Sequence, residues 1–432
     1  MNLVAYLAAS SLRLNTALIA ASLFASVACA DEGNQFDLPS GTQVEVALDG
    51  HLMVLNAASM LRREQINQRK WNSGDYEFNL RAGSSQRNIA DTGQRFKEWD
   101  VALERPVRLF SKVGIDQDIG IASVAHAEYA LGDARHEAGR LLLRQWFGWQ
   151  REQAQAKLWQ QQVAILTQQT QMTEKRVKAG DAPRLEMNQA QAAVAQASVA
   201  QHQAALRAQL AANELIRQFP SIRLPDAPPA NTPQPIENDL AYWQMRVLEH
   251  NHELGMAQKQ TQIQQLLAQR SRADLLPDPT IGIRYSSETG GNEKVTGVYV
   301  SVPLSFGQRS ATADSVAQQA VIAADQETYV KHRLEGDIYA AHMQAVQGYA
   351  TWEQARSAAQ AVRSNAELVA KAYALGENSL SDSLTAQRLA LESSLAENLV
   401  RLDANEARYR LLLDAHQLWP LDVDGDEHHK HY

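Results

Sequence analysis

One stretch of this chain decides its fold: Arg176-Val-Lys-Ala-Gly-Asp-Ala-Pro-Arg-Leu-Glu-Met-Asn-Gln-Ala-Gln191. A second stretch has the same layout: Ala372-Tyr-Ala-Leu-Gly-Glu-Asn-Ser-Leu-Ser-Asp-Ser-Leu-Thr-Ala-Gln387. In both, a long helical pattern runs into a glycine, and a new helical pattern starts a few residues later. Gly180 and Gly376 suit the position just after a helix end, where a left-handed residue lets loose carbonyl groups find partners. Each stretch therefore predicts the tip of a long helical hairpin.

The residues after each glycine favour the start of a new helix. Asp181 in the first copy, and Asn378 and Ser379 in the second, have short polar side chains that accept hydrogen bonds from the first N–H groups of a helix. The two glycines are 196 positions apart, and the patterns before them match at nearly the same offset. The chain is therefore predicted to be a tandem duplication.

The composition is that of a folded protein. The chain has 432 residues, of which 45% are hydrophobic and 21% are charged, whereas disordered chains have fewer apolar residues. Alanine and glutamine are abundant, which favours long helices with thin apolar seams over one thick core. The net charge is -8 at pH 7, and the sequence has no basic block, so a nucleic-acid partner is not expected.

The N-terminus has the pattern of a secretory signal peptide covering residues 1–30. Arg13 precedes an apolar run that ends in a small-residue cleavage site before Asp31 and is too short to span a membrane. Cys29 is the only cysteine; it is either removed with the signal or lipidated, and Ser26 favours removal. Beyond the signal no apolar run is long enough for a transmembrane helix, so a membrane role would need β-strands or surface contact.

Residues 31–219 are predicted to form the first structural repeat. The spacing of apolar residues changes from helical to strictly alternating near Asp75, and Pro106 ends the second alternating stretch because proline cannot donate to a sheet. The next helix would extend on the order of 100 Å, a length typical of coiled coils or bundles. The predicted elements are a helix at 43–70, strands at 75–82 and 98–105, and helices at 113–179 and 184–219.

A proline-rich linker, residues 220–236, separates this repeat from a second one at 237–419. The order of patterns is the same, and Pro303 lies 197 positions after Pro106. An acidic, His-rich tail at 420–432 ends the chain. The predicted elements of the second repeat are a helix at 240–274, strands at 280–286 and 296–302, and helices at 310–375 and 379–419 with their tip at 376.

Each predicted strand has one apolar face and one polar face. In the first strand Tyr76, Phe78 and Leu80 alternate with charged or polar residues. In a secreted chain without transmembrane helices, this alternation indicates a lipid-facing exterior and a wet lumen. Four strands are too few for the smallest such barrel, so several chains would have to share one. The alternative is a soluble β-hairpin packed on helices.

The duplicated layout resembles the TolC-like outer-membrane efflux channel family over essentially the whole mature chain. The motifs that carry the resemblance are Pro106 and Pro303 where strands meet helices, Gly180 and Gly376 at the tips, and Leu276-Pro-Asp-Pro279 before the third strand. The resemblance implies a mainly α fold with a small β part. Each chain would contribute duplicated helical hairpins and four transmembrane strands, and three chains would share a twelve-stranded barrel.

The same resemblance implies the partners and the kind of activity. A homotrimer in the outer membrane of a Gram-negative bacterium would extend through the periplasm as a helical tunnel. A periplasmic adaptor, or membrane fusion protein, would join it to an inner-membrane pump of the RND type. The channel would be a passive duct rather than an enzyme, with no catalytic residues and no cofactor.

Channels of this family narrow near the periplasmic tip, often at acidic residues just past the tip glycine. Asp382 lies six residues after Gly376, and Glu186 lies six after Gly180. Three copies of either would form a ring of like charge that attracts cations and favours opening. The alternative is a first-turn carboxylate that stabilises the helix dipole. The residues expected to face the adaptor, by the same resemblance, are Gly180, Gly376, Leu375 and Leu380.

The tail places His428, His429 and His431 beside carboxylates. Imidazole and carboxylate groups suit zinc, cobalt, nickel or copper(II); the alternative is an unstructured end that gathers ions incidentally. The tail favours the heavy-metal branch of the family, the cobalt-zinc-cadmium type. His250 and His252 are two positions apart, which on a helix does not place them on one face, so they are interpreted as surface residues.

The sequence therefore predicts the outer-membrane channel of a tripartite efflux system that exports divalent heavy-metal cations. Within the same fold, the alternative is a duct for drugs or for secreted proteins. An alternative of a different class is a soluble periplasmic coiled-coil interaction protein, in which the alternating stretches are only hairpins.

Overall fold

The computed structural model of the protein describes residues 38–74, 76–226, 231–304, 307–419 and 421. The predicted signal peptide, residues 1–30 with Cys29, lies outside this described part, and so do His428, His429 and His431 of the predicted tail. Helices dominate the described part, and its sheet is small and antiparallel. The predicted fold class, mainly α with a small β part, is confirmed.

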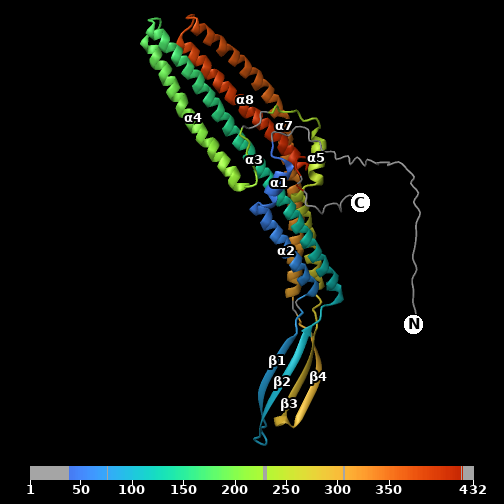
Figure 1. Ribbon diagram of the computed structural model, residues 1–432. Helices are drawn as coiled ribbons and strands as arrows, with labels where there is room; N and C mark the ends of the chain where they lie inside the picture. The colour runs from blue at the N-terminus through green and yellow to red at the C-terminus, as the bar shows by residue number, and fades with distance from the viewer. Residues whose placement is uncertain (1–37, 75, 227–230, 305–306, 420, 422–432) are drawn as a thin grey trace, which may run out of the picture. The chain divides into compact units, whose positions relative to one another are not determined.

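The two halves of the chain contain the same main elements in the same order (Figure 1). The first half contains α1 (Gly41–Asp49), α2 (Leu52–Ser73), β1 (Asn79–Asn88), β2 (Arg95–Pro106), α3 (Phe110–Lys178) and α4 (Arg184–Gln218). The second half contains α5 (Leu240–Glu249), α6 (His252–Ala273), β3 (Thr280–Glu288), the 3-10 turn η1 (Thr289–Gly291), β4 (Glu293–Ser301), α7 (Gln308–Ala374) and α8 (Leu380–Asp414). Each half therefore supplies two strands and one long helical hairpin.

Both hairpin tips close with the same backbone motif. Gly180 and Gly376 have φ angles of 78° and 81°, in the left-handed region that glycine enters without a steric cost. At the second tip the N–H of Glu377 donates to the carbonyl of Ala372 over 2.9 Å, and the first tip makes the equivalent bond. These bonds satisfy carbonyl groups that would otherwise lack a partner at the helix end. The backbone therefore reverses direction at a glycine in both tips.

The two hairpins lie side by side. α3 packs against α4, α7 packs against α8, and α3 also contacts α8 (Figure 1). The main apolar core lies in the middle of α3, where α1, the end of α4 and the end of α8 meet it. Its largest side chains include Trp146, Phe147, Trp149, Phe219 and Trp419. Apart from this region, the long helices are joined mainly by small residues, as the abundance of alanine predicts.

All four strands form one antiparallel sheet in the order β1-β2-β3-β4. The pairing of β2 with β3 joins the two halves of the chain. One row across the sheet places Leu80 opposite Leu103, Leu103 opposite Ile283, and Ile283 opposite Val298. These side chains are 72%, 39%, 54% and 74% exposed, respectively. One face of the sheet is therefore apolar and uncovered in the single chain.

The structure corrects one prediction from the sequence: the first predicted helix of each repeat is two helices. The helix predicted at 43–70 is broken between α1 and α2, and the helix predicted at 240–274 is broken between α5 and α6. At the second break the Asn251 side chain accepts a hydrogen bond from the N–H of Leu254 over 2.8 Å. At the first break His51 accepts one from Met53 over 3.3 Å. A side-chain cap thus starts the new helix in both halves.

The first strand also differs from its predicted bounds. It begins at Asn79 rather than at 75 and continues through Gly83 as far as Asn88, where the sequence suggested a turn. The reason is pairing, because every residue of this segment faces a partner on β2. Among the described helices, none is singly long and apolar enough to cross a membrane, although the bent pair α1 and α2 passes that test when taken together.

Candidate functional site

The two hairpin tips present some of the predicted contact residues to solvent. Gly180 and Gly376 are exposed, and the Leu375 side chain is 75% exposed. Leu380 differs, because its side chain is fully buried in a small apolar cluster with Ala190 and Tyr373. As the first residue of α8 it points into the seam between the hairpins, so the expected exposure of Leu380 is corrected to a packing role.

Glu186 does not stand free near the first tip. The hydroxyl of Tyr373 donates to Glu186 Oε2 over 3.2 Å, and the same hydroxyl lies 2.8 Å from Thr173 Oγ1. Tyr373 is only 1% exposed. The carboxylate of α4 is therefore tied to the end of α7 through a buried tyrosine, an arrangement that joins the two hairpins close to their tips.

Arg176 strengthens this connection from the other side. Its Nη1 donates to the carbonyl oxygen of Tyr373 over 3.3 Å, and its guanidinium group lies 4.9 Å from the centre of the tyrosine ring, a cation–π geometry. Its Nε also donates to Asp181 over 2.9 Å. No sequence pattern singles out Arg176 or Tyr373, because the contacts that join the hairpins connect residues nearly 200 positions apart.

Asp382 has an exposed carboxylate and a local partner. Ser379 Oγ donates to Asp382 Oδ2 over 2.7 Å and accepts from the N–H of Asp382 over 3.1 Å. These two hydrogen bonds form a helix cap. The alternative role considered for Asp382, a first-turn carboxylate that stabilises the helix, therefore has a structural basis. The carboxylate remains on the surface near the second tip.

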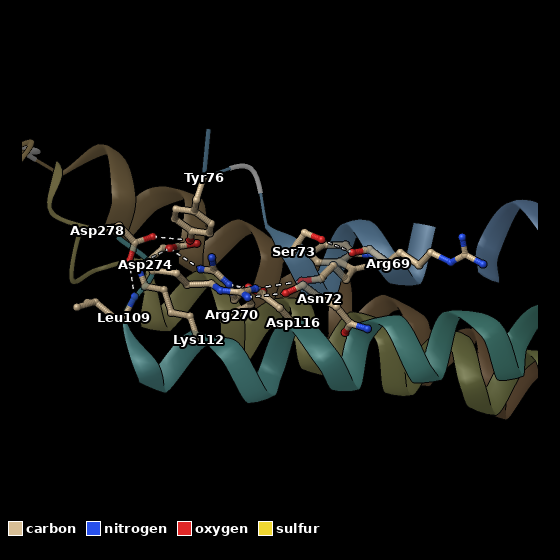
Figure 2. A network of polar contacts seen from close by, with 12 residues as sticks. Arg69, Asn72, Ser73, Tyr76, Leu109, Lys112, Asp116, Arg270, Asp274 and Asp278 are labelled. Atoms are coloured by element: carbon tan, nitrogen blue, oxygen red, sulfur yellow. Dashed lines mark hydrogen bonds and ion pairs between the residues drawn. The ribbon is translucent and has the colours of Figure 1, made fainter. Parts of the chain in front are cut away.

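Buried charges gather at the other end of the helices, where they meet the strands (Figure 2). Lys112 Nζ lies 2.9 Å from carboxylate oxygens of both Asp274 and Asp278. Arg270 contacts Asp116 and Asp274 at 2.5 Å each. The Lys112 side chain has no exposed surface. The network therefore links the start of α3 to the end of α6, one element from each half.

Arg108 extends this network to the end of α2. It donates to Asp116 Oδ2 over 2.9 Å and to the carbonyl oxygens of Trp71 and Asn72 over 3.0 and 2.7 Å. These carbonyls belong to the last turn of the helix, where a cation is favoured. The junction between strands and helices is thus held by compensated charges rather than by an apolar core.

The structure offers no ready metal centre in the part of the chain that it describes. No group of three or more His, Cys, Asp or Glu side chains there could hold a metal ion. The predicted metal-binding residues His428, His429 and His431 lie outside the described residues. The interpretation of His252 as a surface residue is wrong, because it is half-buried and packs beside His416 with ring centres 5.0 Å apart.

One protein-family model matches part of the chain. Residues 54–218 match the family model described as outer membrane efflux protein. No curated protein sequence matches the chain. Proteins of this efflux family are passive channels rather than enzymes. The matched residues run from α2 to the end of α4, so they cover the first strand pair and the first hairpin.

Solved structures share the fold over most of the chain. The CmeC outer membrane channel of Campylobacter jejuni aligns with a TM-score of 0.71 at 15% identity, covering 89% of this chain and 86% of that one. The outer membrane protein VceC of Vibrio cholerae aligns with a TM-score of 0.70 at 16% identity, covering 88% and 99%. The open-state MtrE outer membrane channel of Neisseria gonorrhoeae aligns with a TM-score of 0.62 at 16% identity, covering 88% and 89%. The chain therefore has the fold of outer-membrane channels.

Proposed function

We propose that the protein is the outer-membrane channel subunit of a tripartite efflux system. The observation that carries the proposal is the apolar row across the sheet, whose four side chains are 39–74% exposed. Leaving such a face in water costs roughly 25 cal/mol per Å² of apolar surface, whereas lipid removes that cost. The family match over residues 54–218 supports the same placement.

The sheet also needs further strands. Within the described residues, β1 and β4 each pair on one side only. Each therefore leaves an edge of N–H and C=O groups, and in lipid such groups require partners. We infer that three copies join edge to edge in a homotrimer, so that three sets of four strands form a shared twelve-stranded barrel. The hairpins would then line a tunnel through the periplasm.

A matched pair of variants on β3 tests this placement. Ile283 lies in the exposed apolar row, and its neighbour Arg284 faces the opposite side of the sheet, opposite Ala102. Ile283→Lys would place a cation against lipid at a cost of about 2–4 kcal/mol near the bilayer centre. Arg284→Lys replaces one cation by another. We expect the first variant to lose trimer formation and outer-membrane recovery, and the second to retain both.

The readouts are membrane fractionation, native mass spectrometry in detergent, and conductance in planar lipid bilayers. A wild-type protein that forms trimers and conducts supports the proposal. A mature protein that is monomeric and soluble without detergent contradicts it, and the soluble coiled-coil interaction protein would then be the better explanation.

We infer further that the exposed tips engage a periplasmic adaptor joined to an inner-membrane RND-type pump. Leu375, at 75% exposure, offers the apolar contact beside Gly376. Leu375→Asp is expected to abolish export while the trimer still forms, and Glu377→Gln at the same tip is the matched control. Export that survives Leu375→Asp would place the adaptor elsewhere.

The cargo that we propose is divalent heavy-metal cations, supported by the exposed Asp382 near the tip and by the histidines of the tail. Asp382→Asn keeps an oxygen that can accept from Ser379 but removes the charge. We expect it to reduce cation selectivity, measured as reversal potential in planar bilayers, whereas Glu377→Gln should not. Unchanged selectivity would leave Asp382 as a helix cap only. Metal tolerance that survives deletion of residues 424–432 would favour drugs or proteins as cargo.

A further inference from the structure

Four histidines from four different segments converge beside α3. His136 lies on α3, His250 follows α5, His252 begins α6, and His416 follows α8. The ring centre of His416 lies 5.5 Å from that of His136, 6.0 Å from that of His250 and 5.0 Å from that of His252. We call this set the histidine cluster. Its members are far apart in sequence, so only the fold brings them together.

The packing around the histidine cluster leaves space for the ring of His252. A Cβ atom added to Gly132 on α3 would lie 2.5 Å from the ring of His252, so a larger residue at position 132 would displace the imidazole. The ring of Tyr129, on the same helix, lies 6.4 Å from that of His252. The glycine thus reserves the space that the histidine fills.

His416 occupies a position that usually belongs to glycine. Its φ angle is 56°, and the next residue, Gln417, donates its N–H to the carbonyl of Leu412 over 2.8 Å. This is the same helix-ending motif that Gly180 and Gly376 complete at the tips. A side chain in this conformation is uncommon and costs stability. The chain nevertheless places an imidazole there, at the centre of the cluster.

The carboxylate beside the buried His136, that of Asp414, is already paired with an arginine. Asp414 accepts from Arg140 over 2.9 Å and lies 3.8 Å from Arg410, while His136 Nε2 is 3.7 Å from the same carboxylate. Burial, followed by Arg140 and His416, lowers the pKa of His136 to about 2. The charged residues close to the cluster are Asp133, Glu137 and Arg140 on α3, Glu249 on α5, Glu253 on α6, Arg333 on α7, and Arg410 and Asp414 on α8.

The ring orientations favour neutral packing over metal binding. The rings of His136 and His416 are stacked, with 17° between their planes, so they present faces to each other, whereas metal ligands direct a ring nitrogen at a shared point. No described group of such residues is arranged to hold a metal ion. Neutral imidazoles stack at little electrostatic cost, but two imidazolium groups at this separation repel each other.

We propose that the histidine cluster is a proton-sensitive joint, which holds the end of α8 and the α5–α6 break against α3 at neutral pH and releases them in acid. His250 is the exposed member and lies 3.9 Å from Glu249. A proton on the buried His136 meets the neighbouring imidazole of His416 and the guanidinium group of Arg140. This inference does not depend on the proposed function.

The expected size of the effect follows from linkage. An imidazole in water binds a proton with a pKa of about 6.5, whereas one that stays neutral in the packed joint does not bind it. Lowering the pH from 7.5 to 5.5 therefore favours the released state about tenfold when one imidazole, the buried His136, must stay neutral in the joint.

Hydrogen exchange of the full-length protein in detergent, followed by mass spectrometry at pH 7.5 and 5.5, measures release directly. Rates are corrected for the intrinsic effect of pH. We expect segments 130–140, 248–256 and 410–419 to exchange at least tenfold faster at pH 5.5. His416→Gly suits the left-handed backbone and removes the central imidazole, so it should fold and reduce this acid response. His252→Gln is a second test, and His202→Gln, on the exposed surface of α4, is the control.

Two results would overturn the proposal. One is a wild-type protein whose three segments respond to acid no more than the rest of α3. The other is an acid response that persists unchanged in both His416→Gly and His252→Gln. Zinc that slows exchange of the same segments at pH 7.5 in the wild type, but not in the two variants, would also overturn it in favour of a metal site.

Discussion

Lys112 Nζ and Asp278 Oδ1 lie 2.9 Å apart, and the lysine side chain has no exposed surface. The same carboxylate group accepts from the N–H of Leu109 over 3.1 Å and from the hydroxyl of Tyr76 over 2.9 Å. Asp278 therefore connects the segment before β3 with the start of α3 and the segment before β1. One carboxylate thus fixes the point where strands of both halves pass into helices.

Removing the cation at this point should destabilise the fold. Lys112→Met leaves Asp274 and Asp278 without their shared partner, and breaking a buried pair costs about 3–5 kcal/mol. We expect a value near the lower end because the Asp274 side chain is 40% exposed and can recruit water. Denaturant unfolding in detergent measures the change. Lys157→Met, on the exposed surface of the same helix, should be neutral, and an equal effect of both variants would exclude a specific role for the pair.

Acid should weaken the same junction. Burial raises the pKa of Asp278, but its contacts with Lys112 and the N–H of Leu109 outweigh burial and hold the pKa below its usual 3.8. A carboxyl group with a lowered folded-state pKa contributes stability above the unfolded pKa and loses it as the pH falls through the folded value. We expect Lys112→Met to lose part of its difference from wild type below pH 3.8, measured as unfolding midpoints at pH 3 and 5. A constant difference would contradict this assignment.

The stability contribution of Asp133 should depend on pH in the opposite direction. Burial, with Glu137 and Glu253 next in importance, raises its pKa to about 6, so the folded chain favours the protonated acid. The resulting stability is present at low pH and is lost as the pH rises through the interval from 3.8 to about 6. We expect Asp133→Asn to stabilise the protein at pH 7.5 by about 1–2 kcal/mol, a value discounted for partial exposure.

The test of this prediction is a pair of melting curves at pH 4 and pH 7.5. The gain from Asp133→Asn should be present at the higher pH and absent at the lower one. Asp118→Asn removes an exposed carboxylate from the same helix and should change neither. A gain of equal size at both pH values would mean that it does not arise from ionisation of the carboxyl group.

The fold could be predicted because its signals are local. A glycine after a long helical pattern defines each tip, and alternation defines each strand. The breaks between α1 and α2 and between α5 and α6 were missed, because apolar spacing continues across Asn251, and only its side-chain bond to Leu254 reveals the new helix. The end of β1 was missed because Gly83 and its small polar neighbours have low strand propensity, which pairing with β2 overrides.

The site was less predictable because its contacts are not local. Asp382 and its cap lie within four residues of each other, so both roles could be weighed from the sequence. Glu186 and Tyr373 are 187 positions apart, and no spacing rule connects them. Leu380 looked like a tip residue, but the direction of its side chain depends on how the second hairpin packs on the first.

The stability that the Tyr373 hydroxyl contributes to the contact between the hairpins should be measurable by itself. Tyr373→Phe removes the hydroxyl bonded to Glu186 and Thr173 but keeps the ring, so the expected cost is about 1 kcal/mol. A cost of this size corresponds to roughly fivefold faster hydrogen exchange in segments 169–190 and 373–387. Tyr329→Phe, at a tyrosine that is 68% exposed on α7, is the control. Equal exchange in both variants would show that the hydroxyl does not hold the tips together.

The helix break beside the histidine cluster should depend on its cap. Asn251→Ala removes the oxygen that accepts from the N–H of Leu254, and loss of such a cap costs about 1 kcal/mol. The cost should appear as faster hydrogen exchange in the first turn of α6, because the remaining turns keep their own bonds. Asn251→Ser restores an acceptor oxygen of suitable reach and should recover most of the protection. If the serine variant exchanges as fast as the alanine variant, the break is held by packing against α3 rather than by its cap.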